Sequence, residues 1–372
     1  MILEPTTEEH AMLERIAKRI GERVRGAGAE PIIGGSFAKN TWLSGSRDLD
    51  IFARFEATSE SELTERAAAL FEAFPEAETV RGSREYLRLN TEGVTVELIP
   101  IRPLGEHPNT MDRSPDHITY VNEHLARPND VRILKTVLRA RGIYGAESYV
   151  RGFSGYVCEL LIIAYGSLDA LALEASHWER GARVRFNDAN KPFDDVLIVE
   201  DPTDSERNAA AAVDERSFDS FTTLMRRLRD GEPIEKLVEP HPLEPPYALV
   251  RMQAAHEKRD VGFAKLRALH DRLERELRPF GVRASHWSTE EDRWESRFVI
   301  EHEELEPMTT RKGPPTRFTK AAESFREHHP DAYEEDGILT ATVRREETLW
   351  TQVVERVLTH HDIATFETEV VR

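Results

Sequence analysis

The pair Asp48 and Asp50, separated by one leucine, has the residue types and the spacing for metal-assisted chemistry. On a β-strand, residues two apart share a face, so both carboxylates point to one side while Leu49 points into the core. Two carboxylates in this arrangement can bind the divalent cations that clamp a nucleoside triphosphate during phosphoryl transfer. An isolated Asp-x-Asp is more often a solvated strand edge or turn, so the hypothesis depends on the residues around it.

Two neighbouring features favour the catalytic interpretation. The turn Gly34–Ser36 ends an apolar strand and begins a helical segment, where backbone N–H groups and the Ser36 hydroxyl can bind an anion. Glu97 lies on a later predicted strand and faces opposite to Val96 and Leu98. It can serve as a third metal ligand or as the base that accepts the proton of an attacking hydroxyl. This order of turn, Asp pair and third carboxylate predicts a nucleotidyl-transfer site.

Short strands and helices in the first 127 residues must position these side chains. The first helix begins after a cap at Thr6 or Thr7 and has acidic residues in its first turn. The predicted elements are a helix at 7–26, an apolar strand running into the glycine turn at 31–38, a strand at 49–55, a helix at 60–74 and strands at 85–90 and 93–100. They predict a small mixed sheet with helices.

The pattern becomes helical from residue 129 to about 175, with buried-looking helices at 131–138 and 155–165. This mostly helical part closes near Arg229. A cluster of prolines then marks the predicted linker: Pro233, Pro240, Pro242, Pro245 and Pro246.

Beyond the linker, strands and helices alternate in the order βαββαβ, which is typical of a ferredoxin-like or RNA-recognition-type sandwich. The predicted elements are a strand at 247–253, a helix at 261–277, strands at 282–287 and 293–303, a helix at 318–327, a strand at 338–344 and a final helix at 349–358. The fold class predicted from the whole chain is α+β, with domains at 1–127, 128–240 and 241–372.

Composition indicates a globular protein of the cytoplasm. The 372 residues include 39% hydrophobic and 32% charged residues, and no apolar run reaches the roughly 20 residues of a membrane span. No basic-then-apolar signal opens the chain, and the single cysteine, Cys158, excludes an internal disulfide. The net charge is −18, and few of the basic residues are lysine, which suits solvation in concentrated salt. A high-GC genome explains the scarcity of lysine but not the excess of acids.

Colinear motifs along nearly the whole chain resemble the class I, archaeal-type CCA-adding tRNA nucleotidyltransferases of the polymerase β-like superfamily. The motifs are Gly35–Phe52, Val94–Pro100, Asp112–His117, Val131–Glu147, Gly152–Tyr156, Asp201–Ala211 and Lys312–Pro315. The resemblance implies a polymerase β-like head, a helical central domain and an RNA-binding third domain. It also implies template-independent addition of CMP, CMP and AMP to tRNA from CTP and ATP, with Mg²⁺. With the acidic composition, it indicates a halophilic archaeon.

The resemblance also assigns site residues, each at a position that matches a family motif. Asp48, Asp50 and Glu97 would bind the Mg²⁺ ions. The nucleotide-binding residues would be Gly35, Ser36 and Lys39 at the triphosphate, Ser114, His117, Lys135 and Tyr144 around the incoming nucleotide, and Arg207 at the edge of the base and the tRNA backbone. The third domain would bind the acceptor stem and the TψC arm of tRNA, with no membrane partner, and a homodimer stays open.

Structural interpretations exist for the same residues. His117 suits a surface loop, Tyr144 suits a core aromatic residue, and Arg207 suits an ion pair with a nearby acid such as Asp201. Trp42 is expected in the core, and the glycines of Gly152–Tyr156 are expected to allow close packing at the start of a helix.

The chain departs from the family pattern at several positions. Asp48 stands where the family usually has glutamate, Glu97 where it has aspartate, and Lys39 where it has arginine. Family members continue for tens of residues past the position of Arg372, so the tail is expected to be shortened.

Two other functions remain open from the sequence. One is a divergent paralogue that extends another RNA or makes an oligonucleotide. The other is a catalytically reduced RNA-binding protein, which Glu97 motivates. Retention of Ser36, Asp48, Asp50 and Arg207 in register disfavours the second.

Overall fold

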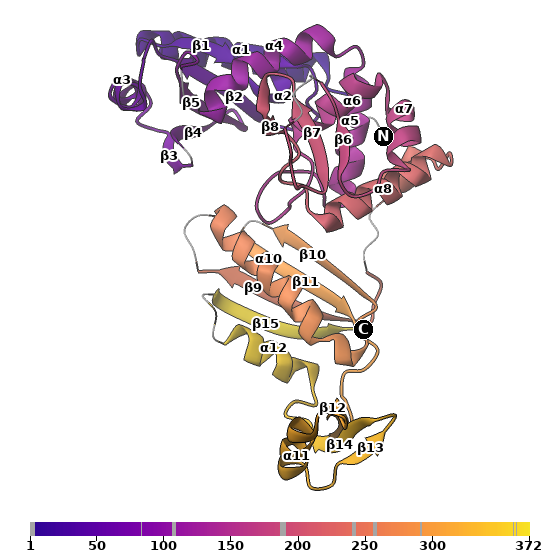
Figure 1. Ribbon diagram of the computed structural model, residues 1–372. Helices are drawn as coiled ribbons and strands as arrows, with labels where there is room; N and C mark the ends of the chain where they lie inside the picture. The colour runs from indigo at the N-terminus through magenta and orange to yellow at the C-terminus, as the bar shows by residue number, and fades with distance from the viewer. Residues whose placement is uncertain are drawn as a thin grey trace. The chain divides into compact units, whose positions relative to one another are not determined.

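The computed structural model describes residues 4–82, 84–105, 109–186, 191–239, 243–255, 259–290, 292–359, 361 and 363–372. The chain divides into two compact units, Met1–Pro240 and His241–Arg372 (Figure 1). Two of the predicted linker prolines, Pro240 and Pro242, lie outside the described residues. The division of the first unit into a catalytic and a nucleotide-binding domain stays a prediction.

The first helix, α1 (Thr7–Gly26), begins where the sequence predicts. Thr6 is its cap, because the Glu9 N–H donates to Thr6 Oγ1 at 3.2 Å and the Thr6 N–H donates to the Glu9 carboxylate at 2.8 Å. Apolar side chains at helical spacing, from Leu13 to Val24, are buried in the core of the first sheet.

A five-stranded mixed sheet in the order β1-β2-β5-β4-β3 carries the predicted metal ligands. Its strands are β1 (Glu30–Ile33), β2 (Asp48–Arg54), β3 (Glu78–Arg81), β4 (Glu85–Thr91) and β5 (Val94–Ile101). Strands β2 and β5 are parallel, and the other pairs are antiparallel. Helices α1 and α3 (Glu60–Ala73) pack on one face of the sheet (Figure 1). The sequence did not predict β3, a short and mostly exposed edge strand without an apolar face.

Helices form most of the rest of the first unit. They are the 3₁₀ helix η1 (Thr110–Arg113), α4 (Ser114–His124), α5 (Pro128–Ala140), α6 (Gly155–Tyr165), α7 (Leu168–Ala175), α8 (Glu215–Arg229) and α9 (Ile234–Val238). The predicted helices at 131–138 and 155–165 are confirmed as α5 and α6. A three-stranded sheet that the sequence analysis did not include lies between α7 and α8 in the chain. Its strands are β6 (Ala182–Val184), β7 (Leu197–Asp201) and β8 (Asp204–Asn208).

Within the described ranges, no single helix has the length and apolarity to cross a membrane. Helices α6 and α7 reach that length and composition only as a pair, and they are bent by 91° relative to each other.

The second unit has a four-stranded sheet in the order β10-β11-β9-β15. Its elements are β9 (Tyr247–Ala254), α10 (Arg259–Glu276), the 3₁₀ helix η2 (Arg278–Phe280), β10 (Ala284–Glu290), β11 (Arg293–Val299), α12 (Trp350–Leu358) and β15 (Ile363–Val371). Helices α10 and α12 pack against each other and against this sheet (Figure 1). The prediction that residues 318–344 complete the sheet was wrong, because α12 and β15 do so.

Residues 318–344 belong instead to an insertion between β11 and α12. Its three-stranded sheet has the order β12-β14-β13, with β12 (Met308–Pro315), α11 (Thr319–His328), β13 (Tyr333–Glu335) and β14 (Ile338–Arg344). The two ends of the insertion are joined, because the Leu305 N–H donates to Thr348 O at 2.8 Å and the Trp350 N–H donates to Glu303 O at 3.3 Å. Both segments have a local helix–strand pattern, and only pairing with β9 decides which segment enters the larger sheet.

Candidate active site

Strand β2 places Asp48 and Asp50 on one face of the five-stranded sheet. Leu49 and Ile51 are buried on the opposite face with α1 and α3, as the predicted alternation requires. On the neighbouring parallel strand β5, Glu97 lies in register beside Asp50. The three carboxylates that the sequence singled out are therefore brought together on a single sheet face.

The same face becomes apolar further along the strands. Phe52, Ile99 and Ile101 form a small core there, against which Met111 of η1 and Ile118 of α4 pack. This core covers one end of the face and leaves the carboxylates at the other end.

The glycine turn packs directly against Asp50. The Gly34 N–H donates to Asp50 O at 2.8 Å, and Gly35 has a φ of +61°. A Cβ atom at Gly35 would lie 1.9 Å from Asp50 Oδ2, and one at Gly34 would lie 2.3 Å from the Phe52 ring. Glycine is required at both positions, and the short helix α2 (Gly35–Ala38) brings Ser36 beside the carboxylates.

Like charges dominate around Asp50. Burial raises the pKa of Asp50 to about 6, and the negative charges of Glu97 and Asp48 add to the rise, while Lys39 partly offsets it. A carboxylate that is this costly to ionise favours a cation beside it. The three carboxylates could hold a divalent metal ion.

Glu97 is oriented by neighbours on β4. Arg88 donates to Glu97 Oε1 from Nε at 3.1 Å and from Nη2 at 2.8 Å, and the Tyr86 hydroxyl lies 3.5 Å from the same oxygen. Among the hydrogen bonds between described residues, those to Glu97 all reach Oε1. Its other oxygen, Oε2, could bind a ligand.

Two of the predicted nucleotide-binding lysines meet at a buried carboxylate. Lys39 Nζ donates to Glu159 Oε2 at 2.5 Å, and Lys135 Nζ lies 3.3 Å from Glu159 Oε1. The Thr41 hydroxyl donates to Glu159 Oε1 at 2.5 Å and accepts from Lys135 Nζ at 3.0 Å. The side chain of Glu159 is 0% exposed, that of Lys135 2% and that of Lys39 10%.

A second group gathers around Asp201 at the end of β7. Arg207 Nη1 donates to Asp201 Oδ2 at 2.6 Å, and His117 Nε2 lies 3.3 Å from the same oxygen. Asp201 Oδ1 accepts from the Tyr156 hydroxyl at 3.0 Å and from the Thr203 N–H and hydroxyl at 2.9 Å each. Burial alone raises the pKa of Asp201, but these partners, His117 first, hold it well below its usual range.

Tyr144 and Ser114 lie at the edges of these two groups. A Cβ atom at Gly155 would lie 3.1 Å from the Tyr144 hydroxyl oxygen and 3.4 Å from Lys135 Nζ, so both groups border the start of α6. Burial raises the pKa of Tyr144 above its usual range. Ser114 begins α4, one turn before His117.

The sequence analysis assigned no function to Tyr156 and Glu159, which connect the two groups. They lie three residues apart on α6 and therefore share a helix face. The Tyr156 ring stacks on His117 with centroids 4.2 Å apart, and Lys39 Nζ lies 5.5 Å from the centroid of the same ring. The signal for Glu159 was its place within an apolar helical run, where an acid is seldom buried without a partner.

The structural interpretations have mixed outcomes. The ion pair of Arg207 with Asp201 is present, and Trp42 is buried in the core. His117 lies in helix α4 rather than in a loop. At Gly152, a Cβ atom would lie 2.1 Å from Ile143 O, which confirms the close packing expected at the start of α6.

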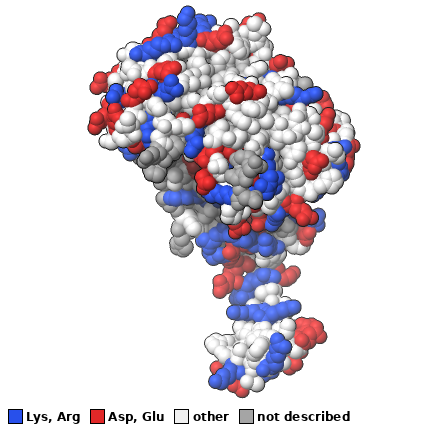
Figure 2. Space-filling model, turned by 45° about the horizontal axis from the view of Figure 1, so that its top comes forward, with Lys and Arg blue, Asp and Glu red and all other residues white. Residues whose placement is uncertain are grey.

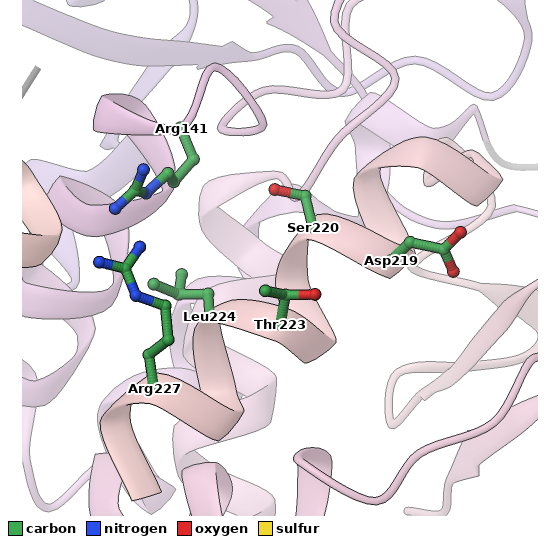
Figure 3. A pocket seen from close by; sticks show the side chains of 6 residues that line it. All are labelled: Arg141, Asp219, Ser220, Thr223, Leu224 and Arg227. Atoms are coloured by element: carbon green, nitrogen blue, oxygen red, sulfur yellow. The ribbon is translucent and has the colours of Figure 1, made fainter. Parts of the chain in front are cut away.

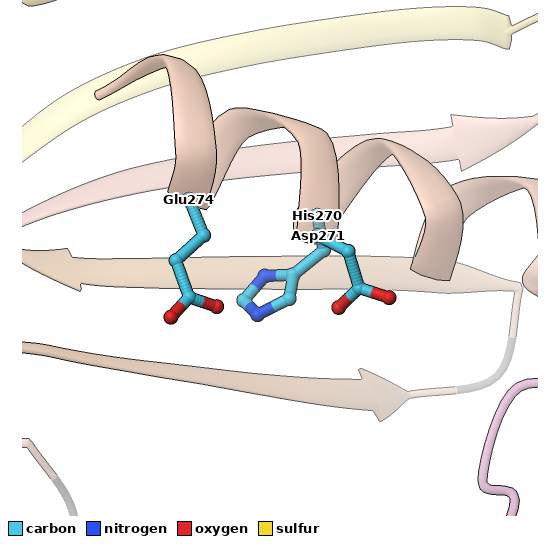
Figure 4. Close-up of side chains that lie close together, drawn as sticks. All are labelled: His270, Asp271 and Glu274. Atoms are coloured by element: carbon cyan, nitrogen blue, oxygen red, sulfur yellow. The ribbon is translucent and has the colours of Figure 1, made fainter. Parts of the chain in front are cut away.

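Two other polar groupings involve none of the predicted site residues. A cavity of about 320 Å³ is lined by Arg141, Asp219, Ser220, Thr223, Leu224 and Arg227 (Figure 3). On α10 of the second unit, His270, Asp271 and Glu274 lie close together (Figure 4). Asp271 accepts from Arg267 Nε at 3.0 Å, and His270 Nδ1 lies 3.0 Å from Ser296 Oγ, so both bind protein partners. On the face drawn in Figure 2, acidic and basic side chains are interspersed.

The protein belongs to the class of nucleotidyltransferases, as its family match and its curated relatives show. A solved structure of a cytoplasmic RNA terminal U-transferase has the same fold, with a TM-score of 0.51 and 14% identity over 65% of this chain and 96% of that one. Residues 129–237 match the family described as tRNA nucleotidyltransferase, second domain.

Curated relatives identify the particular family. The CCA-adding enzyme of Methanoregula boonei is 31% identical over 93% of this chain and 82% of its own length. The CCA-adding enzyme of Pyrobaculum neutrophilum is 32% identical over 88% and 83%, respectively, and that of Halobacterium salinarum is 32% identical over 90% and 80%. The chain belongs to the archaeal, class I family of CCA-adding tRNA nucleotidyltransferases.

Proposed function

We propose that Asp48, Asp50 and Glu97 hold the Mg²⁺ ions with which this CCA-adding enzyme joins CMP, CMP and AMP to the 3′ end of tRNA. The observation that carries the proposal is the position of the half-buried Asp50, in register with Glu97 and on the same face as Asp48. Three carboxylates on one sheet face, beside a turn that can bind phosphate, are suited to nucleotidyl transfer.

The donor set fits a divalent cation of the magnesium type. All three groups are carboxylates, which hard cations prefer, and burial together with the charges of Glu97 and Asp48 raises the pKa of Asp50. When bound, the metal ions would activate the terminal ribose hydroxyl and neutralise the charge of the departing pyrophosphate. Arg88 holds one oxygen of Glu97 and so fixes the direction of the other.

The protein's own groups bind and orient the triphosphate. In the proposal, the N–H groups of Gly35 and Ser36 and the Ser36 hydroxyl contact phosphate oxygens at the start of α2. The Lys39 and Lys135 side chains add positive charge, and because both lie at Glu159 they approach the nucleotide from one side.

The group around Asp201 is proposed to read the base. Asp201 holds His117 and Arg207 in fixed directions, and an arginine guanidinium offers several donors in a plane, which suits the edges of cytosine and adenine. Tyr144 and Ser114 are proposed to border the same nucleotide.

The second unit is proposed to be a ferredoxin-like RNA-binding domain. Its larger sheet has the element order βαββ followed, after the insertion, by αβ. Such a platform would bind the acceptor stem and the TψC arm through shape and backbone contacts, as is usual for structured RNA.

An incorporation assay tests the proposal. A tRNA that ends at its discriminator base is incubated at high salt with labelled CTP and ATP, and the control is the same tRNA with CCA already complete. We expect two CMP and one AMP to be added to the first and nothing to the second. Absence of CMP incorporation, or equal extension of unrelated RNA ends, would contradict tRNA as the acceptor.

A further inference from the structure

Glu159 is a buried carboxylate with three donor groups from outside its own helix. Its two oxygens are divided between them, with Lys39 on Oε2 and both Thr41 and Lys135 on Oε1. Although burial alone raises the pKa of Glu159, the two lysines outweigh it and hold the pKa below its usual range. The carboxylate is therefore charged and fully paired.

The segment that Glu159 holds follows directly after the glycine turn. Its other anchor is Arg132 of α5, which donates from Nε to Trp42 O at 2.9 Å and from Nη2 to Asn40 O at 2.8 Å. Lys135 lies one turn further along α5 and donates to Thr41 O at 3.0 Å. Backbone contacts to α5 thus fix the path of residues 40–42.

The backbone contacts do not fix the direction of the Lys39 side chain. The hydrogen bond from Lys39 to Glu159 fixes it. Lys39 also acts on the charge of Asp50, so its ammonium group lies between two sets of carboxylates. A long and flexible lysine side chain has many rotamers, and a buried partner removes most of them before a ligand binds.

The group formed by Glu159, Lys39 and Lys135 has more basic than acidic side chains. Two lysines share one carboxylate, and burial lowers the pKa of Lys135. When both lysines are protonated, the group carries one positive charge more than Glu159 neutralises. An excess of positive charge beside the glycine turn is suited to the negatively charged tail of a triphosphate.

We propose that Glu159 is a positioning residue for nucleotide binding, which holds the ammonium groups of Lys39 and Lys135 where the triphosphate binds. The inference rests on the proposed function, in which the Lys39 and Lys135 side chains add positive charge beside the triphosphate. Glu159 itself does not touch substrate. Its effect is to order the lysines in advance, which lowers the entropic cost of binding.

The test is the variant Glu159→Gln, which keeps the shape of the side chain and removes its charge. We expect the Kd for CTP, measured by calorimetry, and the KM for CTP and ATP to rise about tenfold or more. The KM for tRNA should stay unchanged and kcat should fall by less than about threefold. An unchanged Kd for CTP would overturn the inference.

A matched control is Glu200→Gln. Glu200 is also a buried glutamate of the first unit, and it accepts from Arg183 Nη1 at 2.8 Å. Its replacement is expected to lower stability and to leave the Kd for CTP unchanged. Equal losses of CTP affinity in both variants would indicate a general loss of packing and would contradict a positioning function.

Two further variants keep the inference testable if Glu159→Gln does not fold. Thr41→Val removes one hydrogen bond to Glu159 and is expected to raise the Kd for CTP about threefold. In a Lys39→Met background, Thr41→Val should weaken CTP binding less than it does alone, and an equal loss would overturn the inference. If the unmodified chain bound no CTP, the proposed nucleotide site itself would fail, which is a separate outcome.

Discussion

Two aspartates of the first unit, the half-buried Asp50 and the buried Asp201, have opposite electrostatic surroundings. Asp50 lies beside two other carboxylates, and its pKa is raised to about 6. Asp201 accepts hydrogen bonds from several donors, and its pKa is held well below its usual range. Without a bound cation, Asp50 is costly to ionise, whereas Asp201 is stabilised as an anion by protein groups.

Protein groups do not fully balance the charge of Asp50, whereas they do balance the charge of Asp201. Around Asp201 the protein supplies its own partners, among them the Arg207 guanidinium, so His117 and Arg207 are already oriented. Around Asp50 the balancing cation has to come from outside, which is expected where a metal ion binds. Loss of hydration raises the pKa of both aspartates, but the net pKa shifts have opposite signs.

The largest expected effect is on catalysis at Asp50. The change Asp50→Asn keeps the size of the side chain but removes the charge of a proposed metal ligand. We expect CMP incorporation into tRNA to fall by about 10³-fold or more, because several kcal/mol of transition-state stabilisation depend on the metal ions. Affinity for tRNA, measured by filter binding, should stay within about twofold. If turnover persisted near its original rate, the assignment of Asp50 as a metal ligand would be wrong.

The same pair of residues should affect stability in opposite directions. Because the pKa of Asp50 is raised, its stabilising contribution is present below about pH 4 and is lost as the pH rises through about 6. At pH 7, without metal, Asp50→Asn should therefore raise the free energy of unfolding by up to about 3 kcal/mol.

Asp201→Asn should instead lower the free energy of unfolding by about 3 kcal/mol at pH 7, because Arg207 and His117 lose their partner. The stabilising contribution of Asp201 is present at neutral pH and is lost as the pH falls. Chemical unfolding in the presence of a chelator measures both variants. A change of the same sign in both would break the comparison.

A smaller effect is expected from Gly35→Ala. The added Cβ would meet Asp50 Oδ2 at 1.9 Å, and the φ of +61° is strained for alanine, so the carboxylate must move. A displacement of about 1 Å at a reacting centre lowers the rate about 10²-fold, and a steady-state incorporation assay measures the loss. The control is Gly45→Ala, which has a similar positive φ but no atom within 4 Å of its Cβ position. Equal losses in both variants would contradict a specific contact with Asp50.

The smallest effect is expected from Tyr156→Phe. This change removes the 3.0 Å hydrogen bond to Asp201 and keeps the ring that stacks on His117. We expect the KM for CTP and ATP to rise about threefold to tenfold, as for a loss of about 1 kcal/mol. An unchanged KM would show that the other partners of Asp201 are sufficient to orient His117.

The sequence predicted the parts of the site that depend on local pattern. Alternation around Leu49 was enough to place Asp48 and Asp50 on one face, and Glu97 was found in the same way on a second strand. That β2 and β5 are neighbours depends on sheet pairing, which a single sequence does not reveal. The assignments of Lys39, Lys135 and Arg207 came from resemblance to a family, and their proposed contacts with nucleotide stay predictions.

Other parts could not be predicted because distant segments decide them. The three partners of Glu159 lie 24 to 120 residues away in the chain. In the second unit, the prediction ended with the helix at 349–358 and missed the strand β15 that follows it. The segment at 350–371 enters the larger sheet because β15 pairs with β9, more than 100 residues earlier in the sequence.

The insertion between β11 and α12 has a consequence for how this chain can change. Its two ends are hydrogen-bonded to each other at Leu305 and Thr348. The insertion is therefore attached to the larger sheet as a closed loop. The length of such a loop has little effect on the cost of closing it, since each doubling adds only about 0.6 kcal/mol. The insertion can therefore gain, lose or exchange residues while β9, β11 and β15 keep their register, which makes it a replaceable module.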